Sequence, residues 1–343
     1  MPLTTPDSSS SASLATLGER GLIQRIRDRF PAAPGSLHVG IGDDAAVTAG
    51  VRGELEVLTT DAMVEGVHFD LRFSSFEDVG YKALAVNVSD IAAMGATPRL
   101  ALLSLILPER LSVGDVDALL EGFGRMAAEA GVSLAGGNIT STSGPLVIDV
   151  TAVGHVRLRR ILTRKGGRPG DILYVTGAIG GASAGLGMLR AGLAAPGDPE
   201  VAALIERHKR PVPRLRTGAL LGRTRCATAC MDLSDGLADG VAQLAAASGT
   251  GAVINAEALP IPAAARRWFE SQGADPVAAA VAGGDDYELV FSVPPRFRGR
   301  LKTVIQQGRG LPVTPIGELT ASPAILLKRD GATEPLPDGF THF

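Results

Sequence analysis

With 343 residues, 45% of them hydrophobic, and a mean hydropathy of +0.20, the chain is expected to form a well-packed protein of two domains rather than a disordered one. Its formal net charge of −3 argues against a nucleic-acid partner, and no apolar run reaches the roughly 20 residues that cross a bilayer, so no membrane partner is expected. The first residues show neither the basic region nor the apolar core of a secretory signal, which predicts a cytoplasmic protein.

Alternating helix and strand patterns follow a Ser/Thr-rich start. Residues 1–17 are predicted to be a disordered tail, and residues 18–157 are predicted to form the N-terminal domain. The apolar spacing in this domain predicts, in chain order, a helix over 21–30, a strand over 54–58 that delivers Thr59-Thr60-Asp61 to its end, a helix over 76–94, a strand over 99–107, a helix over 116–130, and strands over 132–135 and 146–156.

The sequence changes character at residues 158–170, where basic residues cluster beside glycines, and a C-terminal domain over 158–343 is expected from there. Its predicted elements are a strand over 171–176, a helix over 182–193, a strand over 226–233, a helix over 237–247, a strand over 287–293 and short strands over 313–317 and 324–327. The expected fold class is α/β (α+β), built as two domains whose strands lead into acidic loops. A ligand is expected in a crevice between domains.

Six short segments combine acidic or amide residues with Gly, Ser and Thr. They are Gly40–Ala45, Thr59–Asp61, Asn87–Asp90, Gly136–Asn138, Met231–Gly236 and Gly283–Glu288. Carboxylates gathered in one fold repel each other unless cations hold them together. Hard oxygen ligands of this kind suit Mg²⁺, which also bridges substrate phosphates. The pattern therefore predicts an enzyme that uses a magnesium nucleotide.

Each segment taken alone has a simpler structural interpretation. Asp43-Asp44 after two glycines is compatible with a turn, and Thr59-Thr60-Asp61 with a helix N-cap. Ser234 or Asp235 could cap the helix that follows, although a helix N-terminus also binds phosphate. Asp90 is the hardest to explain structurally, because it lies in an otherwise apolar helix and a buried carboxylate needs a partner.

Several familiar motifs are missing or fail on context. Residues 122–127 fit the letters of a dinucleotide-binding fingerprint, but they fall inside a helical pattern with no strand before them. The sequence has no Gly-Lys-Ser/Thr phosphate loop, and its five histidines show no metal-ligand spacing. Cys226 and Cys230 lack the spacing of a zinc or redox site and are expected to be buried apolar residues. Any ATP site must therefore be built without a Walker loop.

The order of these segments, together with Leu162-Thr163-Arg164, Arg210-Pro-Val-Pro-Arg214 and the closing Gly339–Phe343, closely resembles the thiamine-monophosphate kinase family from about Gly18 to the end. The resemblance implies the fold shared with aminoimidazole ribonucleotide synthetase and selenophosphate synthetase. In that fold the N-terminal domain binds ATP and Mg²⁺ and pairs across a homodimer, and the C-terminal domain completes the site. It also implies that ATP and thiamine monophosphate give ADP and thiamine diphosphate.

The resemblance further implies roles for individual residues. Asp44, Asp61, Asp90 and Asp232 would be catalytic, and the ATP contacts would come from Gly137, Asn138, Arg164 and Ser234. The thiamine phosphate would face His68, Asp285 and Phe340. The Mg²⁺ ligands would be Asp44, Thr59, Thr60, Asp61, Asp90, Asn138, Asp232 and Asp235.

Two positions depart from the family pattern. Asn138 stands where the family has Asp, so one negative charge is missing and one Mg²⁺ is expected to bind more weakly or with altered geometry. Asp285 stands where the family often has Glu, and its shorter side chain could reach the substrate through water. These departures affect the expected rate and metal stoichiometry more than the reaction class.

Because the acceptor is itself an ionised phosphate, no strong general base is required, and direct in-line transfer without a phosphoenzyme is expected. Two alternatives remain open at this point. One is another ATP-dependent enzyme of the superfamily, such as an aminoimidazole ribonucleotide synthetase-like ligase; selenophosphate synthetase is disfavoured because no Cys lies in the N-terminal glycine-rich region. The other is an ATP-binding protein with reduced turnover, which Asn138 motivates.

Overall fold

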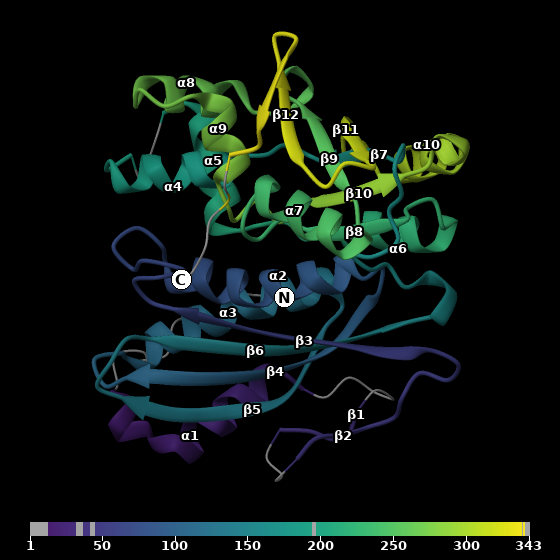
Figure 1. The fold of residues 1–343 in the computed structure, drawn as a ribbon. Coiled ribbons are helices and arrows are strands. Elements are labelled where there is room, and N and C mark those ends of the chain that lie inside the picture. The colour runs from purple at the N-terminus through teal and green to yellow at the C-terminus, as the bar shows by residue number, and fades with distance from the viewer. Residues whose placement is uncertain (1–12, 32–36, 42–44, 194–196, 338, 340–343) are drawn as a thin grey trace. The chain divides into compact units, whose positions relative to one another are not determined.

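The computed structural model describes residues 13–31, 37–41, 45–193, 197–337 and 339 (Figure 1). The chain divides into two compact units. Unit 1 comprises Met1–Val88 and Pro98–His155, and unit 2 comprises Ser89–Thr97 and Val156–Phe343. Unit 2 therefore includes a short stretch, 89–97, from within the expected N-terminal domain.

Unit 1 is built on a four-stranded sheet in the order β3-β6-β4-β5 (Figure 1). The strands are β3 (Leu55–Val64), β4 (Thr97–Pro108), β5 (Ser133–Thr142) and β6 (Val147–Val156), and the helices α2 (Phe76–Ala93) and α3 (Val113–Ala130) lie over one face of the sheet. Along β6 every second residue is buried, including Ile148, Val150 and Ala152. This alternation is typical of a sheet with one covered face.

Two glycines explain how closely α2 and α3 pack. A Cβ at Gly80 would lie 1.9 Å from the carbonyl oxygen of Leu119, and a Cβ at Gly122 would lie 1.8 Å from that of Glu77. The two helices thus meet backbone to backbone, which requires a residue without a side chain at both positions. Gly122 lies in the interior of α3, so rejecting the dinucleotide fingerprint there is correct.

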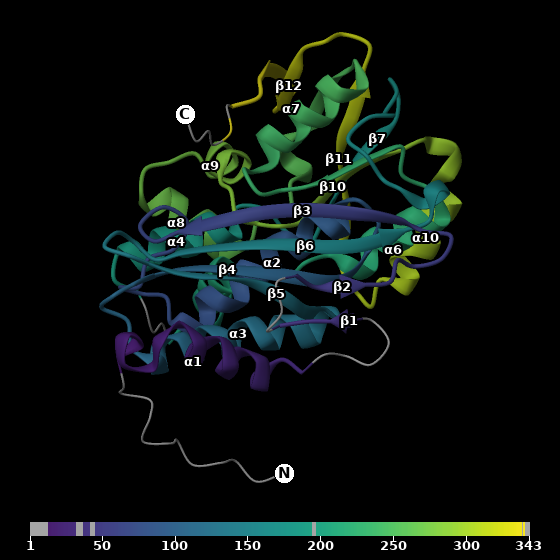
Figure 2. The same cartoon turned by 90° about the horizontal axis from the view of Figure 1, so that it is seen from below.

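Helix α1 (Leu14–Arg29) lies beside α3 (Figure 2). The rings of Phe30 and Phe123 meet edge to face with centroids 5.9 Å apart, and Arg25 forms an ion pair with Asp117. The helix begins at Leu14, so residues 14–17 are helical where the sequence predicted disorder. The reason is a local cap, since the Ser13 hydroxyl accepts the N–H of Thr16.

A short antiparallel pair, β1 (Leu37–Val39) and β2 (Val47–Thr48), completes unit 1. Unit 2 contains a seven-stranded sheet in the order β13-β12-β9-β11-β7-β10-β8. In it β12 pairs in parallel with β9, and the other pairings are antiparallel. The strands are β7 (Ile172–Thr176), β8 (Ala229–Asp232), β9 (Gly251–Asn255), β10 (Leu289–Val293), β11 (Val313–Thr320), β12 (Ile325–Arg329) and β13 (Ala332–Pro335).

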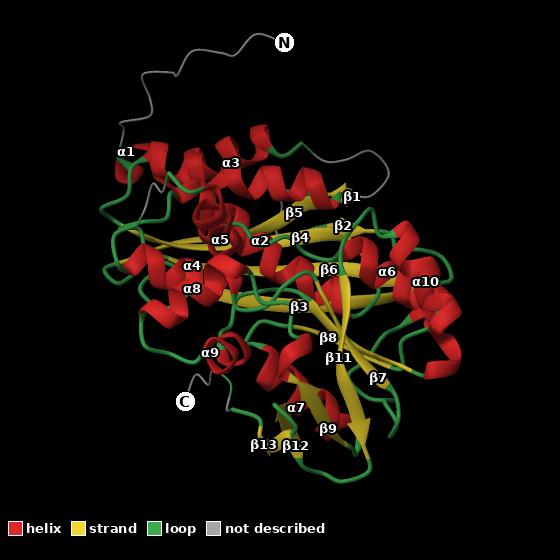
Figure 3. Ribbon diagram, turned by 90° about the horizontal axis from the view of Figure 1, so that it is seen from above, coloured by secondary structure: helices red, strands yellow, loops and turns green. Residues whose placement is uncertain are grey.

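Helices cover the sheet of unit 2 (Figure 3). They are α4 (Gly181–Arg190), α5 (Pro199–Lys209), α6 (Leu215–Thr224), α7 (Leu237–Ser248), α8 (Ala263–Ser271), α9 (Pro276–Ala282) and α10 (Arg298–Gln307), with 3₁₀ turns η1 (Leu158–Arg160), η2 (Ala256–Ala258) and η3 (Pro295–Phe297). Strand β10 is buried along its whole length, and Phe291 on it stacks on Tyr174 with ring centroids 5.7 Å apart. None of the described helices is long and apolar enough to cross a membrane.

Candidate active site

The expected ligands Thr59, Thr60 and Asp61 lie in the middle of β3, not at its end as predicted. Successive side chains of a strand point to opposite faces, so Thr59 and Asp61 share one face and Thr60 lies on the other. There the Thr60 hydroxyl donates to Asp149 Oδ1 at 3.0 Å and lies 3.1 Å from the Thr151 hydroxyl. The side chains of Thr60 and Asp61 therefore do not converge on one point.

Gly137 and Asn138 lie on β5, where they pair with Leu103 and Ser104 of β4. A Cβ at Gly137 would lie 1.9 Å from the Leu103 carbonyl oxygen, so this position accepts only glycine without a shift of the strands. Asn138, the next residue, is exposed. The backbone of the neighbouring strand therefore explains why residue 137 is a glycine.

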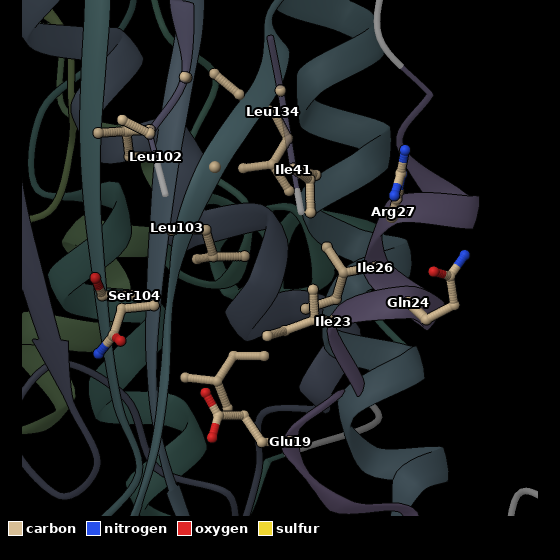
Figure 4. Close-up of a pocket in the computed structure, with 18 of the residues that line it drawn as sticks. Glu19, Ile23, Gln24, Ile26, Arg27, Ile41, Leu102, Leu103, Ser104 and Leu134 are labelled. Carbon is tan, nitrogen blue, oxygen red and sulfur yellow. The ribbon is translucent and has the colours of Figure 1, made fainter. Parts of the chain in front are cut away.

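A pocket of about 960 Å³ lies within unit 1 between α1 and the strands β4 and β5 (Figure 4). In the close-up Ile23 and Ile26 of α1 lie on the same side of β4 as Leu103, and Leu102 and Ser104 lie on its other side. Its polar lining includes Ser104, Asn138 and Thr151, and its lining also contains Gly137, Ile41 and Ala45. Helix α1 also contributes Glu19, Gln24 and Arg27 to the lining, so apolar and charged groups are mixed around the pocket.

Two of the expected site residues lie outside the described residues, namely Asp44 and Phe340. The positions on either side of the 42–44 segment, Ile41 and Ala45, both line the pocket of unit 1. No geometry follows for the Asp44 carboxylate or the Phe340 ring themselves.

His68 follows β3 in a turn of unit 1. Its Nδ1 accepts the N–H of Val64 at 3.1 Å, and its carbonyl oxygen accepts from the Lys82 ammonium at 3.4 Å. Because Nδ1 is an acceptor, the neutral ring carries its proton on Nε2. His68 can therefore offer an N–H donor to an oxygen anion.

In unit 2 the end of α2 meets the end of β8. Ser89 and Asp232 are both buried, and the Ser89 hydroxyl donates to Asp232 Oδ2 at 2.6 Å. Asp90, the neighbour of Ser89, is half-buried. The expected ligands Asp90 and Asp232 thus come from elements that are in contact, although they lie far apart in the sequence.

The loop 232–236 packs directly on residues 283–288, which we call the acidic loop. The Asp285 N–H donates to the Ser234 carbonyl at 2.7 Å, and the Tyr287 N–H donates to the Leu233 carbonyl at 2.9 Å. A Cβ at Gly284 would lie 2.6 Å from the Ser234 carbonyl oxygen, so this contact requires glycine. Two segments that the sequence singled out separately therefore form one acidic site, which brings Ser234, Asp235 and Asp285 together.

Arg164, the remaining expected ATP contact, lies on an exposed turn after η1. Its guanidinium bonds the Gln243 side chain on α7, and Gln243 in turn donates to Asp239 at 2.6 Å. Helix α7 begins directly after the 232–236 loop. Arg164 is therefore connected to the acidic site of unit 2 through this helix.

Sequence reasoning gave no role to the buried groups behind the acidic loop. Glu288 is fully buried beside Arg214, and His208 Nδ1 lies 3.3 Å from Asp285 Oδ2. Asp286 accepts the N–H groups at the start of α4, and burial raises the pKa of its carboxyl to about 7. The motifs around Arg214 and Glu288 are visible in the sequence, but nothing in them shows that they touch.

The expected metal ligands are divided between the units. Thr59, Thr60, Asp61 and Asn138 belong to unit 1, and Asp90, Asp232 and Asp235 belong to unit 2. Within the part of the chain that the structure describes, no three His, Cys, Asp or Glu side chains lie together as a metal site. The donor groups themselves, carboxylate, hydroxyl and amide oxygens, are those that Mg²⁺ prefers.

Comparison with known proteins first defines the class. The family model of the AIR synthase related protein, N-terminal domain, matches residues 42–156, and that of the C-terminal domain matches residues 168–328. The structure of Escherichia coli HypE, a hydrogenase maturation protein, has the same fold, with a TM-score of 0.77 at 22% identity over 93% of this chain and 98% of that chain. The predicted two-domain α/β fold is confirmed.

More similar relatives narrow the class. Thiamine-monophosphate kinases of Bacillus subtilis (strain 168) and Escherichia coli (strain K12) are each 39% identical, the first over 90% of this chain and 94% of the relative, the second over 95% and 98%. The crystal structure of thiamine-monophosphate kinase from Stenotrophomonas maltophilia K279a gives a TM-score of 0.80 at 36% identity, over 90% of this chain and 96% of that chain. The chain belongs to the thiamine-monophosphate kinase family, as the resemblance predicted.

Proposed function

We propose that the protein transfers the terminal phosphoryl group of ATP to thiamine monophosphate, giving ADP and thiamine diphosphate. The observation that carries the proposal is the match to the structure of AaThiL complexed with AMPPCP and TMP, an ATP analogue and a phosphate acceptor in one protein. That structure is 35% identical with a TM-score of 0.75, over 96% of this chain and 98% of that chain. A match of this extent spans both units.

The proposed roles follow the residues that the structure describes. The proposed nucleotide contacts are Gly137, Asn138, Arg164 and Ser234. His68 offers an N–H to the acceptor phosphate, and Asp285 faces the cationic part of the acceptor. The proposed Mg²⁺ ligands and catalytic carboxylates are Asp44, Asp61, Asp90 and Asp232, with Thr59, Thr60, Asn138 and Asp235 as further ligands, and Phe340 is a further acceptor contact.

The chemistry requires positioning and charge neutralisation. The acceptor oxygen is already ionised near neutral pH, so no side chain has to remove a proton from it. Bound Mg²⁺ would neutralise the charge that develops on the phosphoryl oxygens. The protein's own part is to hold two anions in line, and the ring N–H of His68 is one proposed donor.

We further propose a cytoplasmic homodimer that pairs through unit 1. The sheet face away from α2 and α3 carries exposed apolar side chains, with Leu58 67% exposed and Leu102 40% exposed. Exposed apolar side chains on one face favour a protein interface. Light scattering should give twice the mass of the 35.2 kDa chain, and Leu58→Glu should lower it. A monomeric wild type would contradict this proposal.

One assay tests the function. Purified protein with Mg²⁺, ATP and thiamine monophosphate should form thiamine diphosphate and ADP in equal amounts. Product that forms only through a phosphorylated protein would contradict direct transfer. ATP binding without any product would favour the alternative of reduced turnover that Asn138 suggests, and turnover with another acceptor alone would favour a different superfamily activity.

A further inference from the structure

Glu288, at the end of the acidic loop, is a fully buried carboxylate held from three elements. Arg214 donates from Nε at 2.6 Å and from Nη2 at 2.5 Å, in a two-point pair. The Thr176 hydroxyl donates at 2.6 Å, and Arg207 Nη1 lies 3.9 Å away. A buried ion pair adds little stability over a well-packed apolar pair, because both charges lose their hydration. Its presence therefore calls for a role other than stability.

The acidic loop is held in an unusual backbone conformation. Asp285 has a φ of 68° and Tyr287 a φ of 48°, a region that residues with a side chain seldom occupy. Each such residue costs about 1–3 kcal/mol and persists only where surrounding contacts fix it. The residues next to Asp285 and Tyr287 must therefore hold the loop in this conformation.

Two buried carboxylates anchor the acidic loop, Asp286 and Glu288. Asp286 is buried and accepts the N–H groups of Gly180 at 2.6 Å and Ala182 at 3.1 Å. Glu288 is the second anchor, and Thr176, which bonds it, also accepts the N–H of the next residue, Leu289, at 2.9 Å. The even-numbered carboxylates thus hold the loop from inside unit 2.

Asp285 is the loop carboxylate that reaches the surface, whereas Asp286, Tyr287 and Glu288 are buried. The Asp285 side chain is 30% exposed, its Oδ2 lies 3.3 Å from His208 Nδ1, and its Oδ1 accepts from the Tyr287 hydroxyl at 3.3 Å. A carboxylate presented in this manner suits the cationic thiazolium and the amino group of thiamine, not its phosphate. The direction of the Asp285 side chain is fixed by the backbone that the anchors hold.

We infer that Glu288, through its pair with Arg214, is a positioning residue that holds the acidic loop so that Asp285 meets the thiamine part of the acceptor. This inference rests on the proposed function. Replacing the pair should weaken acceptor binding and leave nucleotide binding nearly unchanged, because only the acceptor is expected to touch Asp285. A purely structural role would lower stability and leave both affinities alone.

The test compares two variants with the wild type. Glu288→Gln keeps the shape and removes the charge. The double variant Arg214→Met with Glu288→Leu replaces the ion pair by apolar packing, which is often neutral for stability. A surface variant in the same unit, Arg329→Gln, breaks the 2.7 Å pair with Asp275 and serves as the control.

The readouts are the KM for each substrate and hydrogen exchange of the loop amides. In both site variants the KM for thiamine monophosphate should rise about tenfold or more, a loss of about 1.4 kcal/mol, while the KM for ATP changes less than about twofold. The amides of Asp285 and Tyr287 should exchange faster, because they donate to the 232–236 loop only in the held conformation. The control variant should match the wild type in both KM values and in the exchange of the two loop amides.

Unchanged acceptor KM and unchanged exchange in either folded variant would overturn the inference. Faster exchange spread over the whole of unit 2 would also overturn it, because that indicates general loosening. If the wild type fails to phosphorylate thiamine monophosphate, the proposed function fails. The exchange of the two loop amides then still decides whether Glu288 holds the loop.

Discussion

Asp286 gives a pH-dependent prediction that can be worked through quantitatively. The pKa of its carboxyl is raised from 3.8 to about 7, with burial as the largest cause and the nearby Glu288 as a smaller one. The N–H groups of Ala182 and Gly180 and the Arg207 guanidinium oppose this rise without cancelling it. The folded protein therefore keeps Asp286 protonated at pH values where the unfolded chain has already lost the proton.

The sign and size of the effect of Asp286 on the free energy of unfolding follow from the linkage between proton binding and folding. One pKa unit corresponds to about 1.4 kcal/mol, so ionised Asp286 costs the folded state about 4 kcal/mol relative to the unfolded chain. The contribution of Asp286 is most favourable below its unfolded pKa of 3.8 and is lost as the pH rises through its folded pKa of about 7. About 3 kcal/mol of this change falls between about pH 5 and about pH 8.

The comparison uses Asp286→Asn, which has nearly the same shape and does not titrate. The chain has a single tryptophan, Trp268 on α8, whose Nε1 lies against α4, so its fluorescence reports unfolding of the part that Asp286 caps. Urea unfolding at several pH values gives the free energy of each protein. The wild type should lose about 3 kcal/mol relative to the variant from about pH 5 to about pH 8.

The free energies of unfolding of the two proteins can differ by a constant amount, because Asn replaces one acceptor of the helix N–H groups. Only the change of this difference with pH measures the titration of Asp286. Parallel curves, or a wild type that gains relative stability as the pH rises, would show that the backbone N–H groups outweigh burial and keep Asp286 ionised.

Three further predictions concern other parts of the molecule. Gly122→Ala should destabilise unit 1 by about 3 kcal/mol or more, seen as a lower melting temperature, because its Cβ would lie 1.8 Å from the Glu77 carbonyl oxygen. Ser89→Ala should raise the Mg²⁺ concentration for half-maximal activity several-fold, roughly 1 kcal/mol, because it removes the 2.6 Å hydrogen bond that orients Asp232. Asn138→Asp should lower that concentration or raise activity, because it restores a carboxylate oxygen with full charge.

Each of these has a contrary result. Gly299→Ala on α10 is the control for the first prediction, since a Cβ there meets nothing within 4 Å. Equal melting temperatures for the two variants would refute the close backbone packing of α2 on α3. If Ser89→Ala needs the same Mg²⁺ concentration for half-maximal activity as the wild type, Asp232 is not a metal ligand oriented by Ser89. An Asn138→Asp variant that both loses activity and binds Mg²⁺ more weakly would show that the amide is adapted to its place.

Local sequence pattern predicted most of unit 1 because its elements are long and strongly periodic. It failed at β3, where Thr59, Thr60 and Asp61 were expected to end the strand. The strand continues to Val64, and β3 is an edge strand of the sheet. Thr60 lies on the exposed face of β3, where polar residues are tolerated, whereas Thr59 and Asp61 share the other face with buried Met63. A run of polar residues therefore did not mean that the strand ended.

In unit 2 several helices were not predicted although their start signals are present. Helices α5 and α9 each begin with Asp followed by Pro, and the side chains of Asp198 and Asp275 accept the N–H groups of Glu200 and Val277. An Asp N-cap followed by Pro is a recognised helix start. By contrast, no local signal could reveal the pair of Arg214 and Glu288, which lie 74 positions apart.

The candidate site was predicted as a set of oxygen donors, and the structure adds how some of them depend on each other. Loops 232–236 and 283–288 share backbone hydrogen bonds, and Gly284 permits the contact. Asp235, a proposed metal ligand, and Asp285, proposed to face the acceptor, therefore lie on two loops that are joined by backbone hydrogen bonds. Residues in contact couple energetically, so substitutions in these loops should be non-additive in activity by about 0.5–3 kcal/mol.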